Sequence, residues 1–337
     1  MNWFRALTGF DERQGVYSRL TVQGGRMTSL TNGRVLGCGW LETPSLATLR
    51  ERLAAAGLPK GRPALREVVG DARRLHADPA NANAMFQVAS QFNLLEMVGY
   101  SVTPEAGVTG YEHDHTQGPA CAIACGAGTI YRNWFVPMGD ELGQTADRQI
   151  DCLADVGEAL GNRGQLWEMR NGYALVSQSG RQQITERLAS MAPRERDRLA
   201  SLLRVGLHHN VEVTLGDAGH SVTQVYGSAL PVAYGGGNPS EWAPFARMVL
   251  KASYEATLCA AALNAARTGC RRVFLTLLGG GVFGNDMAWI RQAIVHALKA
   301  VTARGGGDLD VAVVSYGTSN PMVRALATAW GAHGERK

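Results

Sequence analysis

A glycine-rich stretch near the carboxyl end of the chain has the setting of a phosphate-binding loop. The unbroken apolar run at 273–278 predicts a buried strand, and apolar residues at helical spacing after Asn285 predict a helix. Residues 279–285 join the end of that strand to the start of that helix. Free backbone N–H groups and the helix dipole attract phosphate at such a junction. This loop is therefore the first candidate for binding an anionic ligand.

Two better-known phosphate loops do not fit these residues. Gly279, Gly281 and Gly284 satisfy G-x-G-x-x-G, but a dinucleotide-binding unit also requires an acidic residue at the end of the next strand. The next predicted strand, 309–316, ends in Tyr316 instead. The Lys-Ser/Thr pair of a P-loop is also missing. A tight strand-to-helix turn without a ligand remains the plain alternative.

Two polar residues follow other predicted strands. Asp71 comes after the apolar stretch that ends in Gly70, and Asn93 comes shortly after the strand predicted at 85–90. Taken alone, Asp71 could simply cap a turn or helix, and Asn93 could bond loop backbone.

The order of these segments resembles a macrodomain. The resemblance covers about residues 63–134 and 207–330. The first part contains Val-Val-Gly-Asp ending at Asp71, then an apolar strand, then Ala-Ser-x-x-Asn-x-Leu with Asn93. The second part contains a strand, Gly-Gly-Gly-Val-Phe-Gly-Asn, a helix and a further strand. The resemblance implies an α/β fold of the macrodomain kind, with three α/β/α layers and a mixed central sheet. It also implies ADP-ribose as ligand, with no required cofactor and no metal. The residues that it implies for ADP-ribose binding are Asp71, Ala72, Asn93, Gly118, Pro119, Gly280, Gly281, Val282, Phe283, Gly284, Asn285, Tyr316 and Asn320.

The segment from Gly107 to Cys125 departs from common macrodomains, whose catalytic loop is a run of glycines. Pro119 suits the first turn of a helix that Thr116 can cap, so nearby amides could still meet a phosphate. Together with Phe-Asn-Leu-Leu-Glu upstream and Tyr-Arg-Asn downstream, this segment is similar to divergent bacterial-effector macrodomains. Those proteins hydrolyse ADP-ribose from arginine, including on ubiquitin. The resemblance thus implies an ADP-ribosylated protein, with ubiquitin as one candidate, as the partner.

Acidic residues in this segment are the candidates for catalysis. Hydrolysis of an N-glycosidic bond needs a carboxylate to steer water or stabilise positive charge, and a guanidinium leaving group pairs well with carboxylate. Asp114 is the first choice, Glu112 or Glu105 the second, and Gln117 is expected to orient water. The alternative for Asp114 is that it only caps the following helix.

Three other interpretations remain open. The two histidines around Asp114 could bind zinc with a more distant Cys or His, although no recognised zinc spacing is present. The same cleft could serve a reader that binds ADP-ribose without hydrolysing it. A hydrolase of free ADP-ribose derivatives would act on small molecules and need no protein acceptor.

Composition and length fit a soluble globular protein rather than a disordered one. The chain has 337 residues, 45% of them hydrophobic and 18% charged, with a net charge of +4. No basic block indicates nucleic acid, no apolar run reaches the ~20 residues of a membrane span, and the start does not resemble a signal sequence. The six cysteines lack the spacing of a disulfide framework, so we expect a cytosolic protein, or one delivered to a host cytosol.

The order of the predicted elements indicates a macrodomain-like core with an amino-terminal addition and an insertion, rather than a minimal macrodomain. Residues 1–62 are expected to form an amino-terminal elaboration of strands plus a helix, and residues 63–337 the macrodomain-like core. Within the core, about 138–206 is predicted as an insertion containing a helix at 146–160, a hairpin about Asn171-Gly172 and two charged helices. The long apolar pattern at 242–267 predicts another helix.

Overall fold

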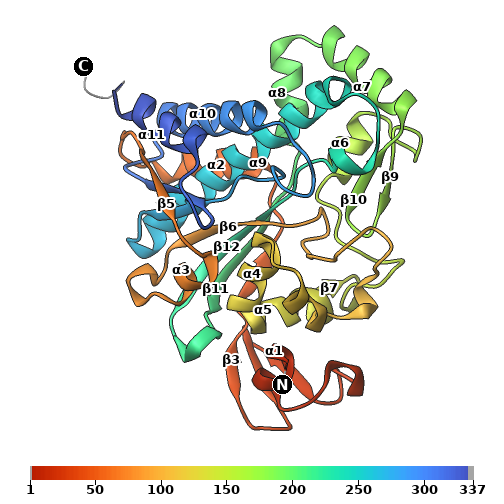
Figure 1. Cartoon of the computed structure of the whole chain (residues 1–337), viewed down its shortest axis with the longest axis vertical. Helices are drawn as coiled ribbons and strands as arrows, with labels where there is room; N and C mark the ends of the chain where they lie inside the picture. Colours follow the sequence, from red (N-terminus) through yellow and green to blue (C-terminus); the bar gives the residue numbers. More distant parts are fainter. Residues whose placement is uncertain (1, 333–337) are drawn as a thin grey trace.

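A seven-stranded mixed sheet runs through the centre of the computed structural model, which describes residues 2–332 (Figure 1). The strand order is β4-β11-β12-β6-β13-β14-β5. The run from β12 to β5 is parallel, whereas β11 pairs antiparallel with both β12 and β4. The strands are β4 (Trp40–Glu42), β5 (Ala64–Val69), β6 (Met85–Ala89), β11 (Gly206–Glu212), β12 (Ser221–Gly227), β13 (Arg272–Leu275) and β14 (Asp310–Ser315).

Helices cover both faces of the sheet, which confirms the predicted three-layer α/β fold with a mixed sheet. One face carries α2 (Leu46–Ala56), α9 (Pro239–Thr268), α10 (Met287–Ala303) and α11 (Pro321–Ala332) (Figure 1). The other face carries α3 (Ala72–Ala77), α4 (Gln117–Ala124) and α5 (Gly126–Ile130). Two-sided cover explains why the central strands are apolar throughout rather than alternating.

The 30-residue helix α9 is the main support of the first face. It packs against α10, α2, α7 and α8 and is buried along most of its length. The predicted helix at 242–267 is thus confirmed and extended, because Asn238 caps the start and Gly269 (φ 79°) ends it. Helix α10 begins after Asp286, whose side chain accepts the N–H of Ala288 and so caps the helix predicted after the glycine loop.

The region before residue 63 contributes directly to the central layers. Strands β1 (Leu20–Gln23), β2 (Arg26–Ser29) and β3 (Val35–Gly37) form a small separate sheet beside α1 (Trp3–Thr8). Strand β4, by contrast, is an edge of the main sheet, and α2 packs on α9. Position 1 and positions 333–337 of the predicted ranges lie outside the described residues.

The insertion differs from its prediction in one element. The helix expected at 146–160 is wrong except for α6 (Ala154–Ala159). Its first half is an irregular turn in which Thr145 bridges Arg148 and the Asp151 carboxylate accepts the N–H of Leu153. The hairpin of β9 (Trp167–Arg170) and β10 (Tyr173–Val176) and the helices α7 (Gln178–Ser190) and α8 (Pro193–Ser201) are as expected.

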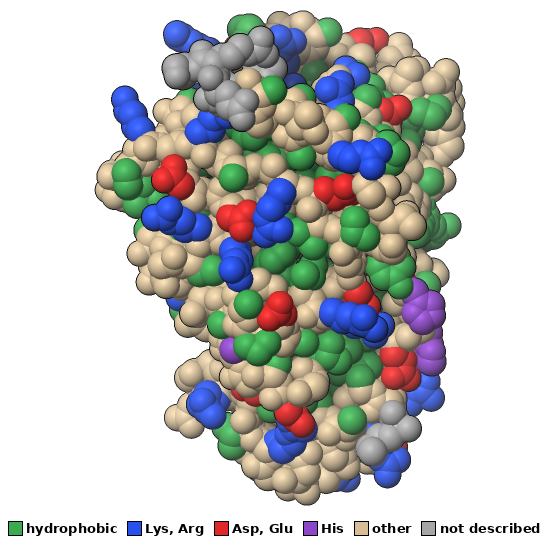
Figure 2. Space-filling view, turned by 60° about the vertical axis from the view of Figure 1, so that its left-hand side comes forward, with side chains coloured by type: hydrophobic (Ala, Val, Ile, Leu, Met, Phe, Trp, Pro, Cys, Tyr) green, Lys and Arg blue, Asp and Glu red, His purple; other side chains and the backbone are tan. Residues whose placement is uncertain are grey.

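The surface mixes both signs of charge. Figure 2 shows basic and acidic side chains interspersed with apolar ones on the face that it presents. Among the described helices, none combines the length and hydropathy that crossing a bilayer requires.

Candidate functional site

The cleft lies where the parallel strands end. Chain segments that follow β5, β6, β13 and β14 meet at this edge of the sheet, together with the start of α4. In open α/β sheets this edge is the usual place for ligands, because loops and helix amino ends converge there.

Two pockets make up the cleft. The β6 pocket, of about 270 Å³, contains residues that follow β6 and β13, including Glu96 and Phe283. The β5 pocket, of about 640 Å³, contains Asp71 and the residues after β14. Both pockets are lined by Asp114, Thr116, Gln117, Thr276 and Leu277, so they are two ends of one elongated site. The structure therefore brings Asp71, Asp114 and Phe283 to one crevice.

The amino end of α4 points backbone donors at the middle of the cleft. The N–H groups of Gln117 and Gly118 have no acceptor within residues 2–332, and Pro119 supplies none. Gly118 is required here by close approach, because a Cβ at this position would lie 2.2 Å from the carbonyl oxygen of Ala89. Free amides at a helix start favour an anion.

The glycine loop provides a second group of amides. Gly279 has φ 72°, and a Cβ there would lie 2.5 Å from that of Ala229, so glycine fits both the backbone and the space. The N–H groups of Gly281, Val282 and Phe283 have no acceptor among the described residues. Gly281, Val282 and Phe283 line the β6 pocket, whereas Gly280 and Gly284 shape the loop without lining it.

Asp114, the first choice for catalysis, stands at the junction of the two pockets. Its Oδ1 accepts the N–H of Thr116 at 2.8 Å, so it also caps the turn before α4. Glu112 lines the β5 pocket, and its Oε2 accepts the backbone N–H of Trp3 at 3.3 Å. Capping one amide leaves Asp114 other lone pairs for a ligand or a water molecule.

Two other residues predicted to be catalytic use their polar groups in hydrogen bonds within the protein. The side-chain amide of Gln117 accepts the N–H of Ala89 and donates to the carbonyl of Gln87, which fastens α4 to β6 and leaves it poorly placed to orient water. Glu105 does not line either pocket. Its carboxylate accepts the N–H of Ala146 at 2.8 Å.

Four residues predicted to bind ADP-ribose lie in the β5 pocket: Asp71, Ala72, Tyr316 and Asn320. Asp71 caps α3 by accepting the N–H of Arg73 at 2.8 Å, and Ala72 lies beside it. Tyr316 is 81% exposed at the mouth, and Asn320 caps α11. The loop that carries these last two residues is held by Glu67, which accepts from Ser315, Ser319 and Asn320.

Two predicted asparagines do not line the cleft. Asn93 is fully buried and bonds the Gln149 side chain and the N–H of Leu95. Asn285 is buried behind the glycine loop and donates to the carbonyl of Leu230 at 2.8 Å. Both side chains bind the loops of the site together rather than face its cavity.

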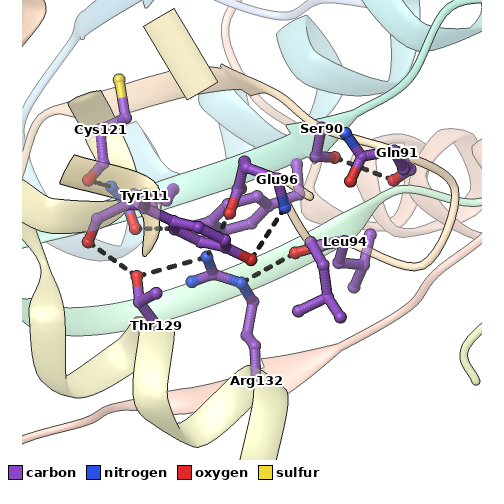
Figure 3. Close-up of polar contacts among 12 residues, drawn as sticks. Ser90, Gln91, Leu94, Glu96, Tyr111, Cys121, Thr129 and Arg132 are labelled. Atoms are coloured by element: carbon purple, nitrogen blue, oxygen red, sulfur yellow. Dashed lines mark hydrogen bonds and ion pairs between the residues drawn. The ribbon is translucent and has the colours of Figure 1, made fainter. Parts of the chain in front are cut away.

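Glu96 is a cleft residue that our sequence reasoning did not select. It lies 3% exposed in the wall of the β6 pocket, after the bend formed by Leu94 (φ 67°). Figure 3 shows its side chain next to those of Tyr111 and Arg132. Arg132 Nη2 is 3.5 Å from Oε2, and the Tyr111 hydroxyl accepts the N–H of Glu96, while Oε1 has no partner in the described protein. A single acidic residue inside an apolar run after a strand was the signal available.

Burial sets the protonation of this carboxyl. Desolvation raises the pKa of Glu96 to about 8, and the nearby Asp114 charge acts in the same direction. The charge of Arg132 opposes this rise but does not cancel it. The guanidinium is fully buried and shared with the carbonyl of Leu94, the hydroxyl of Thr129 and the ring of Tyr226. Burial therefore favours the protonated form of this carboxyl.

Aromatic rings surround the same end of the cleft. Tyr173, Tyr234 and Phe283 line the β6 pocket, with ring centroids 5.4–5.9 Å apart. Tyr100 contacts two of these rings from outside, and Val98 beside it is 73% exposed. An aromatic wall next to acidic groups suits a planar cation.

No three His, Cys, Asp or Glu residues come together as metal ligands anywhere in the described part of the chain. His113 and His115 are both exposed, whereas His208, one of the possible partners, is buried and bonds the carbonyl of Cys38.

The chain matches no family model. It also matches no curated protein. Solved structures with a similar arrangement are poly(ADP-ribose) glycohydrolases. That from Thermomonospora curvata has a TM-score of 0.47 and 18% identity, covering 97% of this chain and 98% of that one. The same enzyme bound to the inhibitor ADP-HPD has a TM-score of 0.44 and 16% identity, with 98% of each chain covered.

A mutant glycohydrolase from Deinococcus radiodurans in complex with ADP-ribose has a TM-score of 0.42 and 14% identity. The match covers 85% of this chain and 90% of that one.

Proposed function

We propose that this protein hydrolyses the bond between ADP-ribose and a protein side chain, and that the side chain is arginine. The observation that carries the proposal is the order of groups along one cleft. The β5 pocket, at one end, contains the carboxylate of Asp71 and the exposed ring of Tyr316. Two sets of backbone N–H groups without acceptors in the described chain follow, at the start of α4 and in the glycine loop. The carboxyl groups of Asp114 and Glu96 lie in the β6 pocket, at the other end.

Each part of that order suits one part of ADP-ribose. Asp71 can accept from the adenine amino group, with Tyr316 available to stack on the ring. The amides of Gly118 and of Gly281–Phe283 can bind the diphosphate between them, without any basic side chain. The distal ribose would then lie in the β6 pocket, next to Asp114 and Glu96.

The two carboxyl groups suit the two tasks of glycosidic hydrolysis. Asp114 would stabilise the oxocarbenium-like carbon and orient the attacking water. Glu96, neutral near pH 7, would donate its proton to the departing nitrogen as the carbon–nitrogen bond breaks. The water oxygen bonds to the anomeric carbon, and the proton that it loses restores Glu96. The products are ADP-ribose and the unmodified side chain.

The aromatic wall supports arginine as the leaving group. Tyr173, Tyr234 and Phe283 offer ring faces to a planar guanidinium, and Asp114 offers a carboxylate. An acidic side chain linked to ADP-ribose is a neutral ester, which would offer no positive charge to Asp114 or to the rings. The modified protein, with ubiquitin as a candidate, would bind outside this rim in the cytosol or in a host cytosol.

The decisive experiment compares three substrates and one variant. We expect release of ADP-ribose from a protein modified on arginine, and slower release from substrates modified on glutamate or serine. Asp114→Ala should lower the rate by about 10²-fold or more. It should still bind free ADP-ribose in calorimetry. Binding by the parent protein without release from any substrate would make the protein a reader, and turnover of free ADP-ribose derivatives alone would exclude a protein acceptor.

A further inference from the structure

A second hollow lies away from the cleft, between the helices of the insertion and those of the core. It has a volume of about 420 Å³ and is bordered by α2, α7, α8, α9 and α10. A shallower hollow of about 370 Å³ continues it along α10 and shares Arg50, Asp197, Glu255 and His296. None of its lining residues lines the cleft. We call the two hollows together the helix groove.

The carboxylates of the helix groove are fully used within the protein. Arg50 bonds both Asp197 oxygens at 2.8 and 2.9 Å and both Glu255 oxygens at 2.6 and 2.9 Å. Glu255 also accepts from His296 at 2.9 Å and lies 3.7 Å from Arg304. These contacts tie α2, α8, α9 and α10 together and leave little negative charge free for a ligand.

The cations of the helix groove are, in contrast, in excess. Its walls carry six Lys and Arg side chains against two carboxylates. Arg247 and Lys251 are one helical turn apart on α9, with Arg196 on α8 and Lys299 on α10. No described carboxylate lies within ion-pair distance of any of these four side chains. Arg196 also donates to the carbonyl of Leu188, and Arg247 lies over the ring of Trp289. The positive charge of all four side chains is therefore left for an external anion.

The floor of the helix groove is aliphatic. Leu46 and Leu188 are buried beneath it, and Met248, Ala189 and Ala200 complete the surface. No Phe, Tyr or Trp lines the hollow. A nucleic acid would use aromatic stacking rather than an aliphatic floor, and a free phosphate would not use the floor at all.

We infer that the helix groove binds an acidic amphipathic segment of a partner protein. Apolar side chains of that segment would lie on Met248, Ala189 and Ala200, and its Asp and Glu residues would pair with Arg247, Lys251 and Arg196. This is helix-in-groove recognition with complementary charge. The inference does not depend on the proposed hydrolase activity, because the two sites share no residue.

Fluorescence anisotropy tests the inference directly. The probe is a fluorescein-labelled 16-residue peptide with Glu on one helical face and Leu on the other. At low salt we expect micromolar binding, weakened about tenfold between 50 and 300 mM NaCl as charges are screened. Arg247→Glu with Lys251→Glu should weaken binding at least 30-fold. Ala189→Trp, which fills the groove and keeps its charge, should weaken it at least tenfold.

The matched control changes the same charge outside the groove. Arg194 and Arg198 are exposed on α8 and do not line the hollow, so Arg194→Glu with Arg198→Glu should bind the peptide within twofold of the parent protein. All variants should keep the parent melting temperature and the parent rate of ADP-ribose release.

Three results would overturn the inference. These are no binding of the peptide at millimolar concentration, equal binding of a scrambled peptide of the same composition, or tighter binding of single-stranded RNA. Failure of ADP-ribose release in the parent protein would instead count against the proposed function alone.

Discussion

Glu96 and Asp114 are carboxyl groups of one pocket in different surroundings. Asp114 is partly exposed and accepts a backbone N–H, whereas Glu96 is enclosed by Tyr111, Arg132 and the end of β6. Pairs of acids whose environments separate their pKa values are a common way to obtain an acid and a base at one pH. The division of labour in the proposed reaction depends on this difference in burial.

The pH dependence of the reaction follows from the protonation of Glu96. The raised pKa, about 8, means that the proton is present at pH 7 and is lost as the pH rises through 8. We expect the rate of ADP-ribose release to fall on the alkaline side with that midpoint. Glu96→Gln should lower the rate by about 10²- to 10⁴-fold and remove the alkaline fall. Initial rates measured from pH 5 to 10 test both statements.

Glu112→Gln is the control for this prediction. Glu112 belongs to the other pocket, so its variant should keep the alkaline midpoint of the parent protein. If Glu96→Gln also kept that midpoint, the acid would be another group. Retained ADP-ribose binding would show that the Glu96 variant is folded.

At the scale of elements, the junction of β6 and α4 decides the shape of the cleft. Gln117 bonds the backbone of β6 at two points, and Gly118 packs against Ala89. The start of α4 is thus fixed at the distance that a ligand between α4 and the glycine loop requires. A small change at this contact should therefore alter ligand binding as well as stability.

Gly118→Ala tests this contact. The new Cβ would lie 2.2 Å from the Ala89 carbonyl and 3.0 Å from Glu96, so α4 must move away from β6. We expect ADP-ribose affinity to fall at least tenfold and the free energy of unfolding to fall by about 1–3 kcal/mol. Gly110→Ala is the control, because a Cβ there meets nothing within 4 Å. Unchanged affinity in Gly118→Ala would mean that α4 does not contact the ligand.

Sequence reasoning reached the segments of the cleft better than the individual side chains. Asp71 and Phe283 follow strands, and the ends of parallel strands meet at one edge, so their meeting in one cleft was predictable. The pKa of Glu96 is raised because the folded chain buries its carboxyl, and the segments that carry Tyr111 and Arg132, which enclose it, come from later parts of the chain. The pattern around Glu96 contains no periodicity that would reveal such burial.

Three polar residues selected from the sequence bond protein groups: Asn93 and Glu105 do not line the cleft, whereas Gln117 lines it and bonds the backbone of β6. Gln117, Glu105 and Asn93 are polar and close in sequence to the cleft, but the backbone and side-chain groups that they bond are distant in sequence. Local sequence patterns cannot show such hydrogen-bond partners, because only the folded chain brings these groups together. The helix expected at 146–160 failed for a similar reason, since the polar residues of this segment bond its irregular backbone.

At the scale of the whole molecule, Glu255 links α9 to α2 and α10, and its partner Arg50 extends the link to α8. Burial alone would raise the pKa of Glu255, but hydrogen bonds from His296 and Arg50 outweigh it and lower the pKa to about 2. The ionised carboxylate therefore stabilises the fold above pH ~4.3, the ordinary pKa of Glu, and this stabilisation is lost as the pH falls towards 2.

Glu255→Gln should remove that contribution. We expect the free energy of unfolding at pH 7 to fall by about 3 kcal/mol, because Arg50 keeps only Asp197 as an anionic partner. The difference between the variant and the parent protein should shrink as the pH is lowered from 5 to 2.5. Urea unfolding across this range measures it. A constant difference would mean that packing, rather than charge, is responsible.

The two edge strands of the central sheet pair with strands that are synthesised much later. Both edges of the sheet, β4 and β5, leave the ribosome early, but β4 pairs with β11 and β5 pairs with β14, near the end of the chain. The nascent polypeptide thus carries β4 unpaired until β11 has been made, and β5 unpaired until β14 has been made. We expect chains arrested before residue 310 to be captured by chaperones or to aggregate, because β5 has no neighbour until then.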